Sequence, residues 1–287
     1  MQNPVCLSPL KFYDGIAKQN HRKSCAYGHI SPLIVTTQSL PPFQFIVSNG
    51  ENLSLEEAYF VDVQSDTRIG SNKAQLLIET GFSIITKGDY TVALYPGYLP
   101  LQIEREGQYY LELKLSNGAA YYSEVFCFTN HTDDCVEIEY WNETGDFYIK
   151  DGIVIFPENF HFKLLLMSEI GKPEYDFEEE ATKRGGYSFI EHQVSKKVYK
   201  FGAVAPEFIC DAMRIIRLCD NKIIRYKDEE YDAITFEMQV EWQTQGDLAV
   251  VTCEFETDNI VANLGGFVPD KKGGDFNSDY NSDFDNT

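Results

Sequence analysis

The run Tyr109-Tyr-Leu-Glu-Leu-Lys-Leu115 places apolar residues at every odd position, while Glu112 and Lys114 face the other way. It is followed by Asn117-Gly118 and then by Ala119-Ala-Tyr-Tyr-Ser-Glu-Val-Phe126. A period of two is typical of half-buried strands, and Asn-Gly between two such runs supplies the positive φ angles of a tight type I′ turn. The stretch therefore predicts an antiparallel hairpin and indicates a mainly β fold.

The same pattern recurs in much of the chain. Phe236, Met238, Val240 and Trp242 alternate with polar residues, Gln245-Gly246-Asp247 follows as a turn, and Ala249, Val251, Cys253 and Phe255 alternate again. This predicts a second half-buried hairpin. The further strand candidates are Phe43–Ser48, Ala58–Val63, Gln75–Glu79, Thr91–Tyr95, Val136–Trp141, Gly152–Phe156, Phe162–Met167, Val194–Phe201 and Lys222–Tyr226.

One segment, Pro206 to Cys219, has the periodicity of a helix. Its apolar face holds Phe208, Ile209, Ala212, Ile215, Ile216 and Cys219, and its polar face holds Glu207, Asp211, Arg214 and Arg217. Pro206 suits the start of a helix. We expect one short helix that packs on a sheet.

The polar run from Phe128 to Asp134 separates the blocks that the two hairpins close. Many short antiparallel strands with turns between them predict a mainly β protein with two β-sandwich-like domains, 1–128 and 129–262. We expect the second domain to contain the helix 206–219 and a long charged loop at 171–186, and we expect residues 263–287 to form an acidic extended arm.

The net charge of −21 disfavours contact with phosphate backbones, so sequence-specific nucleic-acid binding is not expected. The excess of acidic residues can serve solubility alone, or these residues can line a lumen through which DNA slides. The seven cysteines include no CxxC pair and are typical of core residues made in a reducing compartment. The first residues do not resemble a signal peptide, and apolar runs such as Leu164–Met167 are too short to cross a bilayer, so no membrane contact is expected.

Catalytic and cofactor-binding motifs such as G-x-S-x-G, the P-loop, H-E-x-x-H and G-x-G-x-x-G are missing from the sequence. His21, Cys25 and His29 could meet at a metal, but zinc requires four ligands at characteristic spacings, and a polar N-terminal arm explains them equally. We expect no metal and no cofactor.

Glu137 and Glu139 lie on one face of a predicted strand, with Trp141 next on that face. Paired carboxylates beside an aromatic ring suit sugar hydrolysis, whereas alternating Glu residues on a strand are more often a solvated face. We therefore expect no enzymatic activity and no catalytic residue.

The C-terminal segment places Asp275, Asn277, Asp279, Asn281 and Asp283 at every second position. These resemble the start of a calcium loop, but the Gly at the sixth position and the Glu at the twelfth are replaced. The alternative is an acidic peptide that binds a neighbouring chain through aromatic anchors. The anchors would be Phe276, Tyr280 and Phe284, and Tyr175 and Phe177 in the segment 171–186 have the same character; either segment can also be a solvated stretch without a partner.

Several phrases together resemble virion structural proteins of the crAss-like tailed bacteriophages of Bacteroidetes. They are Leu40-Pro-Pro-Phe-Gln44, Tyr109–Leu113 leading to Tyr121–Phe126, Glu169-Ile-Gly-Lys-Pro-Glu-Tyr175 and Pro206-Glu-Phe-Ile-Cys-Asp-Ala212, and their order matches that family across roughly residues 40–256. The resemblance implies a non-enzymatic, β-rich subunit present in many copies around a symmetry axis. It supplies no catalytic residues and does not extend to residues 270–287.

We therefore expect a structural subunit that forms a homo-oligomeric ring in the neck, as part of the head-to-tail connection, or in the tail. Its partners would be further copies of itself and the adjacent tail, neck or portal proteins. It would be made in the cytoplasm of a bacterial host and would reside in the virion. The alternative is a β-sandwich that binds carbohydrate or a host surface, with Trp141, Tyr110 and Tyr122 as aromatic platforms.

Overall fold

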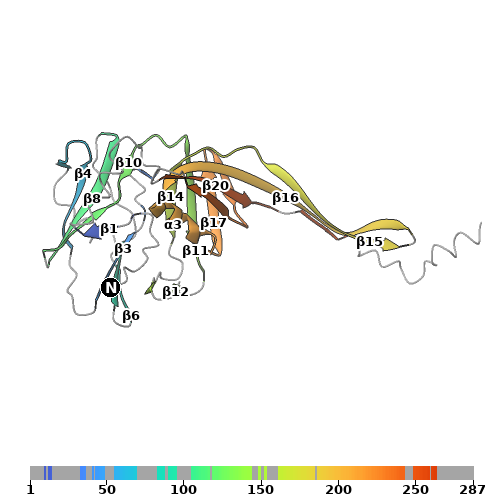
Figure 1. The fold of residues 1–287 in the computed structure, drawn as a ribbon, viewed down its shortest axis with the longest axis horizontal. Helices are drawn as coiled ribbons and strands as arrows, with labels where there is room; N and C mark the ends of the chain where they lie inside the picture. Colours follow the sequence, from blue (N-terminus) through green and yellow to red (C-terminus); the bar gives the residue numbers. More distant parts are fainter. Residues whose placement is uncertain are drawn as a thin grey trace, which may run out of the picture. The chain divides into compact units, whose positions relative to one another are not determined.

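The regular elements of the described chain are strands and a single helix, in this computed structural model (Figure 1). This confirms the expectation of a mainly β protein with one short helix. The residues described are 10, 12–14, 33–36, 41, 43–48, 55–69, 83–87, 90–95, 105–116, 118–143, 148–149, 152–153, 161–184, 186–242, 248–258 and 260–263.

The chain divides into two compact units. Unit 1 comprises Met1–Lys172 and Tyr199–Thr257, and unit 2 comprises Pro173–Val198 and Asp258–Thr287. The boundary expected near residues 128–134 stays a prediction.

The hairpin predicted around residue 117 lies in the largest sheet of unit 1. Its strand β8 (Gly107–Leu115) pairs with β4 along one edge and with β9 and β10 along the other. Glu112 lies opposite the apolar face as predicted, yet it is buried because Arg68 forms two hydrogen bonds to its carboxylate, at 2.7 and 3.1 Å. The other strands of this sheet are β1 (Phe12–Asp14), β2 (Ile34–Val35), β4 (Leu55–Asp62), β5 (Arg68–Ile69), β9 (Ala120–Ser123) and β10 (Phe126–Phe128).

The turn of this hairpin is longer than predicted. The N–H of Leu115 donates to the carbonyl of Ala119, and the N–H of Gly118 donates to the carbonyl of Leu115. Gly118 has φ +79°, as a left-handed residue must. A two-residue type I′ turn is therefore wrong, because three residues separate the paired positions and the glycine occupies the third.

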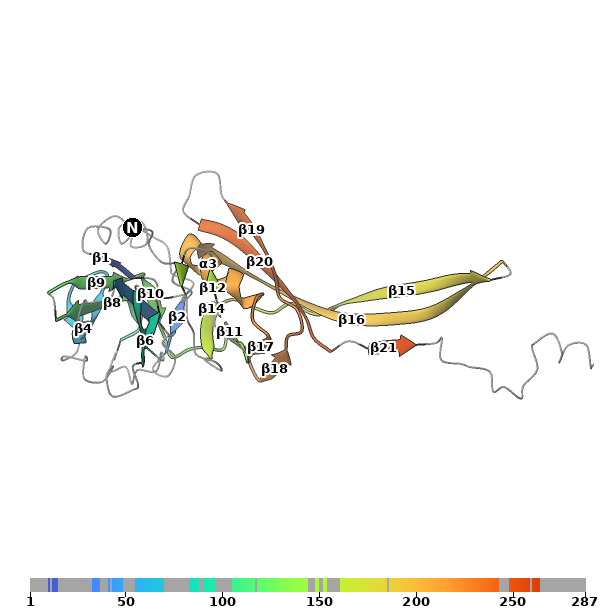
Figure 2. The same ribbon diagram turned by 90° about the horizontal axis from the view of Figure 1, so that it is seen from below.

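A second sheet of unit 1 is built on β11 (Cys135–Trp141), which pairs with β14 (Phe162–Met167) and β17 (Asn221–Tyr226), and β18 (Glu229–Asp232) follows (Figure 2). Ile138 of β11 lies opposite Leu164 on one side and Ile224 on the other, and all three are fully buried. These apolar residues alternate with charged ones on the other face of the sheet, as the period of two predicted, although the charged side chains are partly buried.

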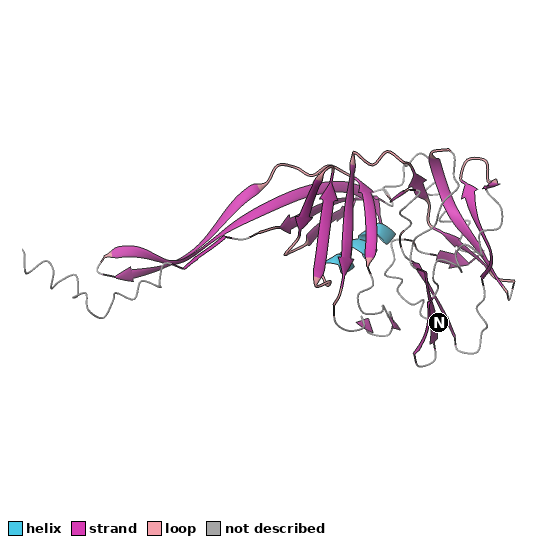
Figure 3. Ribbon diagram, turned by 180° about the vertical axis from the view of Figure 1, so that it is seen from behind, coloured by secondary structure: helices cyan, strands magenta, loops and turns pink. Residues whose placement is uncertain are grey.

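The second predicted hairpin is confirmed as β19 (Glu237–Trp242) and β20 (Leu248–Glu256), although its turn residues lie outside the described residues. Helix α3 (Glu207–Ile216), shown in cyan in Figure 3, packs on both strands. Its apolar face is buried as expected. The residue Pro206 caps the helix in an extended conformation and also ends the preceding strand, β16 (Tyr187–Pro206).

One hydrophobic cluster holds unit 1 together, with members from Leu10 to Phe255. Phe255 is fully buried, and its ring lies 5.5 Å from that of Tyr199 and 5.7 Å from that of Tyr231. Aromatic packing of this kind adds to the burial of apolar area. The apolar residues of β20 therefore point into a core that is formed by the same chain.

The remaining strands of unit 1 form two small sheets. The predicted strands at 43–48 and 91–95 are confirmed, part of the one at 152–156 is present, and Gln75–Glu79 lies outside the described residues. The strands are β3 (Phe43–Ser48), β6 (Ser83–Lys87), β7 (Tyr90–Tyr95), β12 (Tyr148–Ile149) and β13 (Gly152–Ile153).

Unit 2 contradicts one expectation. The segment 171–186 is not a long loop, because most of it forms the strand β15 (Glu174–Arg184), which pairs with β16. A short strand, β21 (Ile260–Asn263), pairs with the other edge of β16. The charged residues that favoured a loop are tolerated because the strand is held by backbone pairing and its side chains stay in solvent.

Candidate interaction surface

Three antiparallel strands make up the described part of unit 2, with β16 between β15 and β21; we call them the ribbon (Figures 1 and 2). They belong to a five-stranded sheet, because β16 also pairs with β20, which pairs with β19. The 11 residues of β15 are paired with β16 throughout. At 3.3 Å per residue the paired length is about 36 Å. The only irregularity is a bulge on β16 between the partners of Glu180 and Ala181.

The ribbon has almost no interior of its own. Among its described side chains only Val198 is buried, and from Glu174 to Lys183 all but Thr182 are exposed. A hairpin without a covered face is marginally stable in water, and three strands gain stability only when one face is buried. The ribbon is thus a surface element that offers both its faces.

One face of the ribbon is apolar. Tyr175 and Phe177 are two residues apart on β15 and therefore point to the same side. Phe177 pairs with Ser195, which in turn pairs with Ile260 of β21, and Ile190 pairs with Ala181 beyond the bulge. Directly paired residues share a face. The four large apolar side chains on this face are Tyr175, Phe177, Ile190 and Ile260, which are 63%, 58%, 36% and 69% exposed.

The opposite face carries most of the ribbon's charge. Glu174, Asp176, Glu178 and Glu180 all lie there, since they alternate with the apolar residues of β15. Lys196, opposite Asp176, donates a hydrogen bond to Glu178 at 2.5 Å. Exposed pairs of this kind contribute little stability, so this face keeps the ribbon soluble rather than rigid.

The structure thus brings together two of the five residues predicted to bind a partner. Tyr175 and Phe177 lie side by side on the apolar face, whereas Phe276, Tyr280 and Phe284 lie outside the described residues. Sequence reasoning missed Ile190 and Ile260, although the order Glu-Tyr-Asp-Phe-Glu at 174–178 already alternates as a strand does. Recognising that strand would have led to its partner strands.

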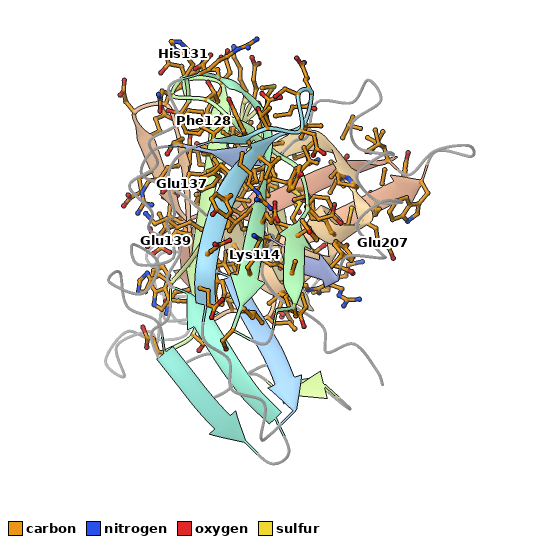
Figure 4. The ribbon with its side chains drawn as sticks, turned by 90° about the vertical axis from the view of Figure 1, so that its left-hand side faces the viewer. Lys114, Phe128, His131, Glu137, Glu139 and Glu207 are labelled. Atoms are coloured by element: carbon orange, nitrogen blue, oxygen red, sulfur yellow. The ribbon has the colours of Figure 1, made fainter. Side chains whose placement is uncertain are left out.

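The carboxylates Glu137 and Glu139 are confirmed to share one face of β11 (Figure 4). Both accept hydrogen bonds from the same Nη1 atom of Arg225, at 2.7 and 2.6 Å. Glu139 is also 2.9 Å from Nδ1 of His161, and Lys163 lies 3.6 Å from Glu137. The two carboxylates are therefore members of a charge ladder across the sheet.

This ladder is poorly suited to general acid catalysis. Burial raises the pKa of Glu139, but hydrogen bonds from Arg225 and His161 outweigh it and hold the pKa below its ordinary value. A glycosidase acid needs the opposite shift. The arrangement favours a structural role for Glu137 and Glu139 in a partly buried network of ion pairs, since their side chains are 25% and 13% exposed.

A cleft of about 600 Å³ adjoins the ladder, lined by Glu137, Lys163 and Arg225 and also by Cys135. Burial raises the pKa of the Cys135 thiol to about 11. A thiol with such a pKa is a poor nucleophile, because the thiolate is the reactive form. Among the lining groups, Glu137, Lys163 and Arg225 already pair with each other and the thiol is unreactive, while Asp133, Lys227 and Asp228 also line the cleft.

The aromatic residues considered for sugar binding do not form a common platform. Tyr110 is buried and donates a hydrogen bond to Asp66, so it cannot stack on a ligand. One face of Trp141 is covered by His161, with the ring centroids 4.3 Å apart. Tyr122 is half-buried beside Tyr110.

In the described parts of the chain, no group of three or more His, Cys, Asp or Glu side chains could hold a metal ion. The residues His21, Cys25 and His29, and the Asp and Asn residues at 275–283, lie outside those parts. Among the described helical residues, none belongs to a helix long and apolar enough to span a membrane.

Comparison with known proteins gives no family. No family model and no curated protein matches the chain. Two solved structures are weakly similar. The crystal structure of the titin domains z1z2 in complex with telethonin has a TM-score of 0.17 at 12% identity, over 60% of this chain and 86% of that one. The crystal structure of Dpr2 Ig1-Ig2 in complex with DIP-Theta Ig1-Ig3 has a TM-score of 0.16 at 7% identity, over 83% and 94%. Such low TM-scores carry no inference.

Proposed function

We propose that the chain is a non-enzymatic structural subunit of a tailed-phage particle, which forms a multi-copy ring in the neck or the tail. The observation that carries this proposal is the ribbon, a sheet with exposed aromatic and aliphatic side chains on one face and almost no interior. The expected location is the virion, after synthesis in the cytoplasm of a bacterial host.

An exposed apolar face of this kind favours a protein partner. Large apolar side chains gathered on one face are a feature of protein interfaces, and aromatic residues are enriched at interface cores. The side chains of β15 are exposed from Glu174 to Lys183 except Thr182, so they are available for contact along this strand.

The charge distribution supports a protein partner over nucleic acid or lipid. The chain carries −21 overall, and four of its carboxylates are aligned on the ribbon's charged face. Both repel phosphate groups. The neighbours that this proposal names are further copies of the chain and the adjacent neck, tail or portal proteins.

The resemblance to crAss-like virion proteins supplies the class of particle. It depends on phrases in both units, including Glu169–Tyr175 at the base of the ribbon and Pro206–Ala212 at the start of α3. The non-enzymatic part of the proposal is supported by the paired state of Glu137 and Glu139. The carbohydrate-binding alternative is weakened by the burial of Tyr110 and by the His161 ring on Trp141.

Native mass spectrometry of the full-length chain at several concentrations, with electron-microscope class averages, tests the proposal. We expect discrete higher oligomers whose population grows with concentration, and closed rings in the class averages. A chain that stays monomeric at every concentration, alone and with phage neck and tail proteins added, would contradict it. In that case binding to a glycan array would identify the carbohydrate-binding alternative.

A further inference from the structure

The apolar face of the ribbon differs from the rest of the chain in charge as well as in polarity. Its charged members are Lys183, Lys197 and Glu179, because these share the alternation of Tyr175 and Phe177 or pair directly with them. The carboxylate of Glu179 already accepts a hydrogen bond from Gln193 at 2.9 Å. In a chain of net charge −21, this face is therefore aromatic and carries few charges.

The C-terminal segment has the complementary composition. In an extended chain, residues two apart share a face. A strand through 275–285 would place Phe276, Ser278, Tyr280, Ser282 and Phe284 on one face. The other face would hold Asp275, Asn277, Asp279, Asn281 and Asp283. The segment is thus aromatic on one side and acidic on the other.

We propose that residues 275–285 of one copy bind the apolar face of the ribbon of a second copy. The aromatic side chains of the segment would pack on Tyr175, Phe177 and Ile260, and its aspartates, on the opposite side of the segment, would stay in solvent. Aromatic anchors supply most of the affinity in such contacts.

The length of chain after the ribbon allows this exchange. β21 ends at Asn263 on the ribbon itself, and residues 264–274 then contain Gly265-Gly266 and Gly273-Gly274. Glycine-rich links of 11 residues reach roughly 20 Å on average, so the segment can leave its own ribbon for a neighbouring one. The choice of a second copy rests on the proposed function as a multi-copy subunit.

The test uses full-length chains and a labelled peptide of residues 273–287. The recipient is the chain with Phe276→Ser, Tyr280→Ser and Phe284→Ser, whose own segment has lost its anchors. We expect the peptide to bind this chain, as measured by fluorescence anisotropy. Adding Tyr175→Ser and Phe177→Ser should weaken that binding by about tenfold or more. The same two sets of substitutions, each alone, should shift the full chain from oligomer to monomer in native mass spectrometry.

Neighbouring residues of β21 supply a matched control. Ile260 is on the apolar face and Val261 on the charged face, with 69% and 54% of their surface exposed. Ile260→Ser should weaken peptide binding and Val261→Ser should not. A peptide of the same composition with its three aromatic residues on alternating faces should bind at least about tenfold more weakly. Because all the substituted ribbon residues are exposed, the thermal unfolding of these variants should match that of the wild type.

The outcomes separate this inference from the proposed function. Oligomers that persist in every variant, with peptide binding unchanged, would leave the proposed function standing and overturn the inference. A monomeric wild type, with peptide binding only to the chain that lacks its anchors, would show that the segment covers its own ribbon and would overturn exchange between copies. If the wild type forms no oligomers and the peptide does not bind, both the inference and the proposed function are overturned.

Discussion

β20 and β15 have the same kind of sequence and opposite surroundings. Along β20 the residues Val251, Cys253 and Phe255 alternate with polar ones and are at most 1% exposed. Along β15 the residues Tyr175 and Phe177 alternate with acidic ones and are 63% and 58% exposed. Alternation therefore identifies an apolar face, but it does not say whether the same chain covers it.

The difference lies in what the rest of the chain provides. Helix α3 and the strand β18 supply apolar partners for β20, among them Tyr231 against Phe255. The ribbon has two long strands and a short third one, and no described helix or sheet of its unit covers either face. Burial of apolar area stabilises a fold, so unit 1 gains more stability from its own packing than the ribbon does.

The largest expected effect comes from removing one aromatic ring from each strand, Phe255 from β20 and Phe177 from β15. Phe255→Ala should destabilise the protein by about 3–5 kcal/mol, because it removes a fully buried ring and leaves a cavity. Phe177→Ala should change the stability of the monomer by less than about 0.5 kcal/mol, because its ring is already in solvent. Chemical denaturation at low protein concentration measures both.

A loss of stability of similar size in Phe255→Ala and Phe177→Ala would contradict the difference between β20 and β15. It would mean that Phe177 is covered within the monomer. If Phe177→Ala matches the wild type at low protein concentration but is less stable than it at high concentration, the ring is buried between copies, as the proposed function requires.

The charged residues offer a second, smaller comparison. Glu139→Gln should cost about 1–2 kcal/mol at pH 7, because a partly buried carboxylate loses its charge-assisted bonds to Arg225 and His161. Glu178→Gln on the ribbon should cost less than about 1 kcal/mol, since its pair with Lys196 is exposed to water.

The pH dependence sharpens this second prediction. The pKa of Glu139 is lower in the folded protein than its ordinary value of 4.5, because hydrogen bonds from Arg225 and His161 outweigh the effect of burial. Its contribution to stability is therefore complete above pH 4.5 and is lost as the pH falls through the folded-state pKa. The gap in unfolding free energy between the wild type and Glu139→Gln should narrow below pH 4.5. A gap that stays constant down to pH 3 would show that the ion pair does not stabilise the fold.

The fold could be predicted largely from local patterns. The hairpins at 109–126 and 236–255, most other strands and the helix after Pro206 follow from periodicity, because their apolar residues meet partners inside unit 1. The turn at Gly118 is one residue longer than the sequence predicts, since Asn-Gly suits both a two-residue turn and the end of a three-residue one.

The candidate surface could be predicted only in part. Composition identifies Tyr175 and Phe177, but the strand that carries them resembles a loop in sequence, because acidic residues outnumber apolar ones in it. Ile190 and Ile260 join them only through the register of three strands far apart in sequence, and a bulge sets the place of Ile190. Such pairing depends on backbone hydrogen bonds, which every residue except proline can form, so the side chains do not encode it clearly.

The smallest expected effect compares two glycines in matching positions. Gly118 in unit 1 and Gly186 at the end of the ribbon have φ +79° and +87°, and a Cβ atom at either would meet nothing within 4 Å. Each Gly→Ala change should therefore cost only backbone strain, about 1 kcal/mol. For Gly118→Ala this loss should appear in global unfolding, because its hairpin belongs to the core of unit 1. For Gly186→Ala it should appear as faster hydrogen exchange in β15 and β16, with global unfolding unchanged, because a ribbon without a core opens separately. Equal effects on global unfolding would show that the ribbon and unit 1 unfold together.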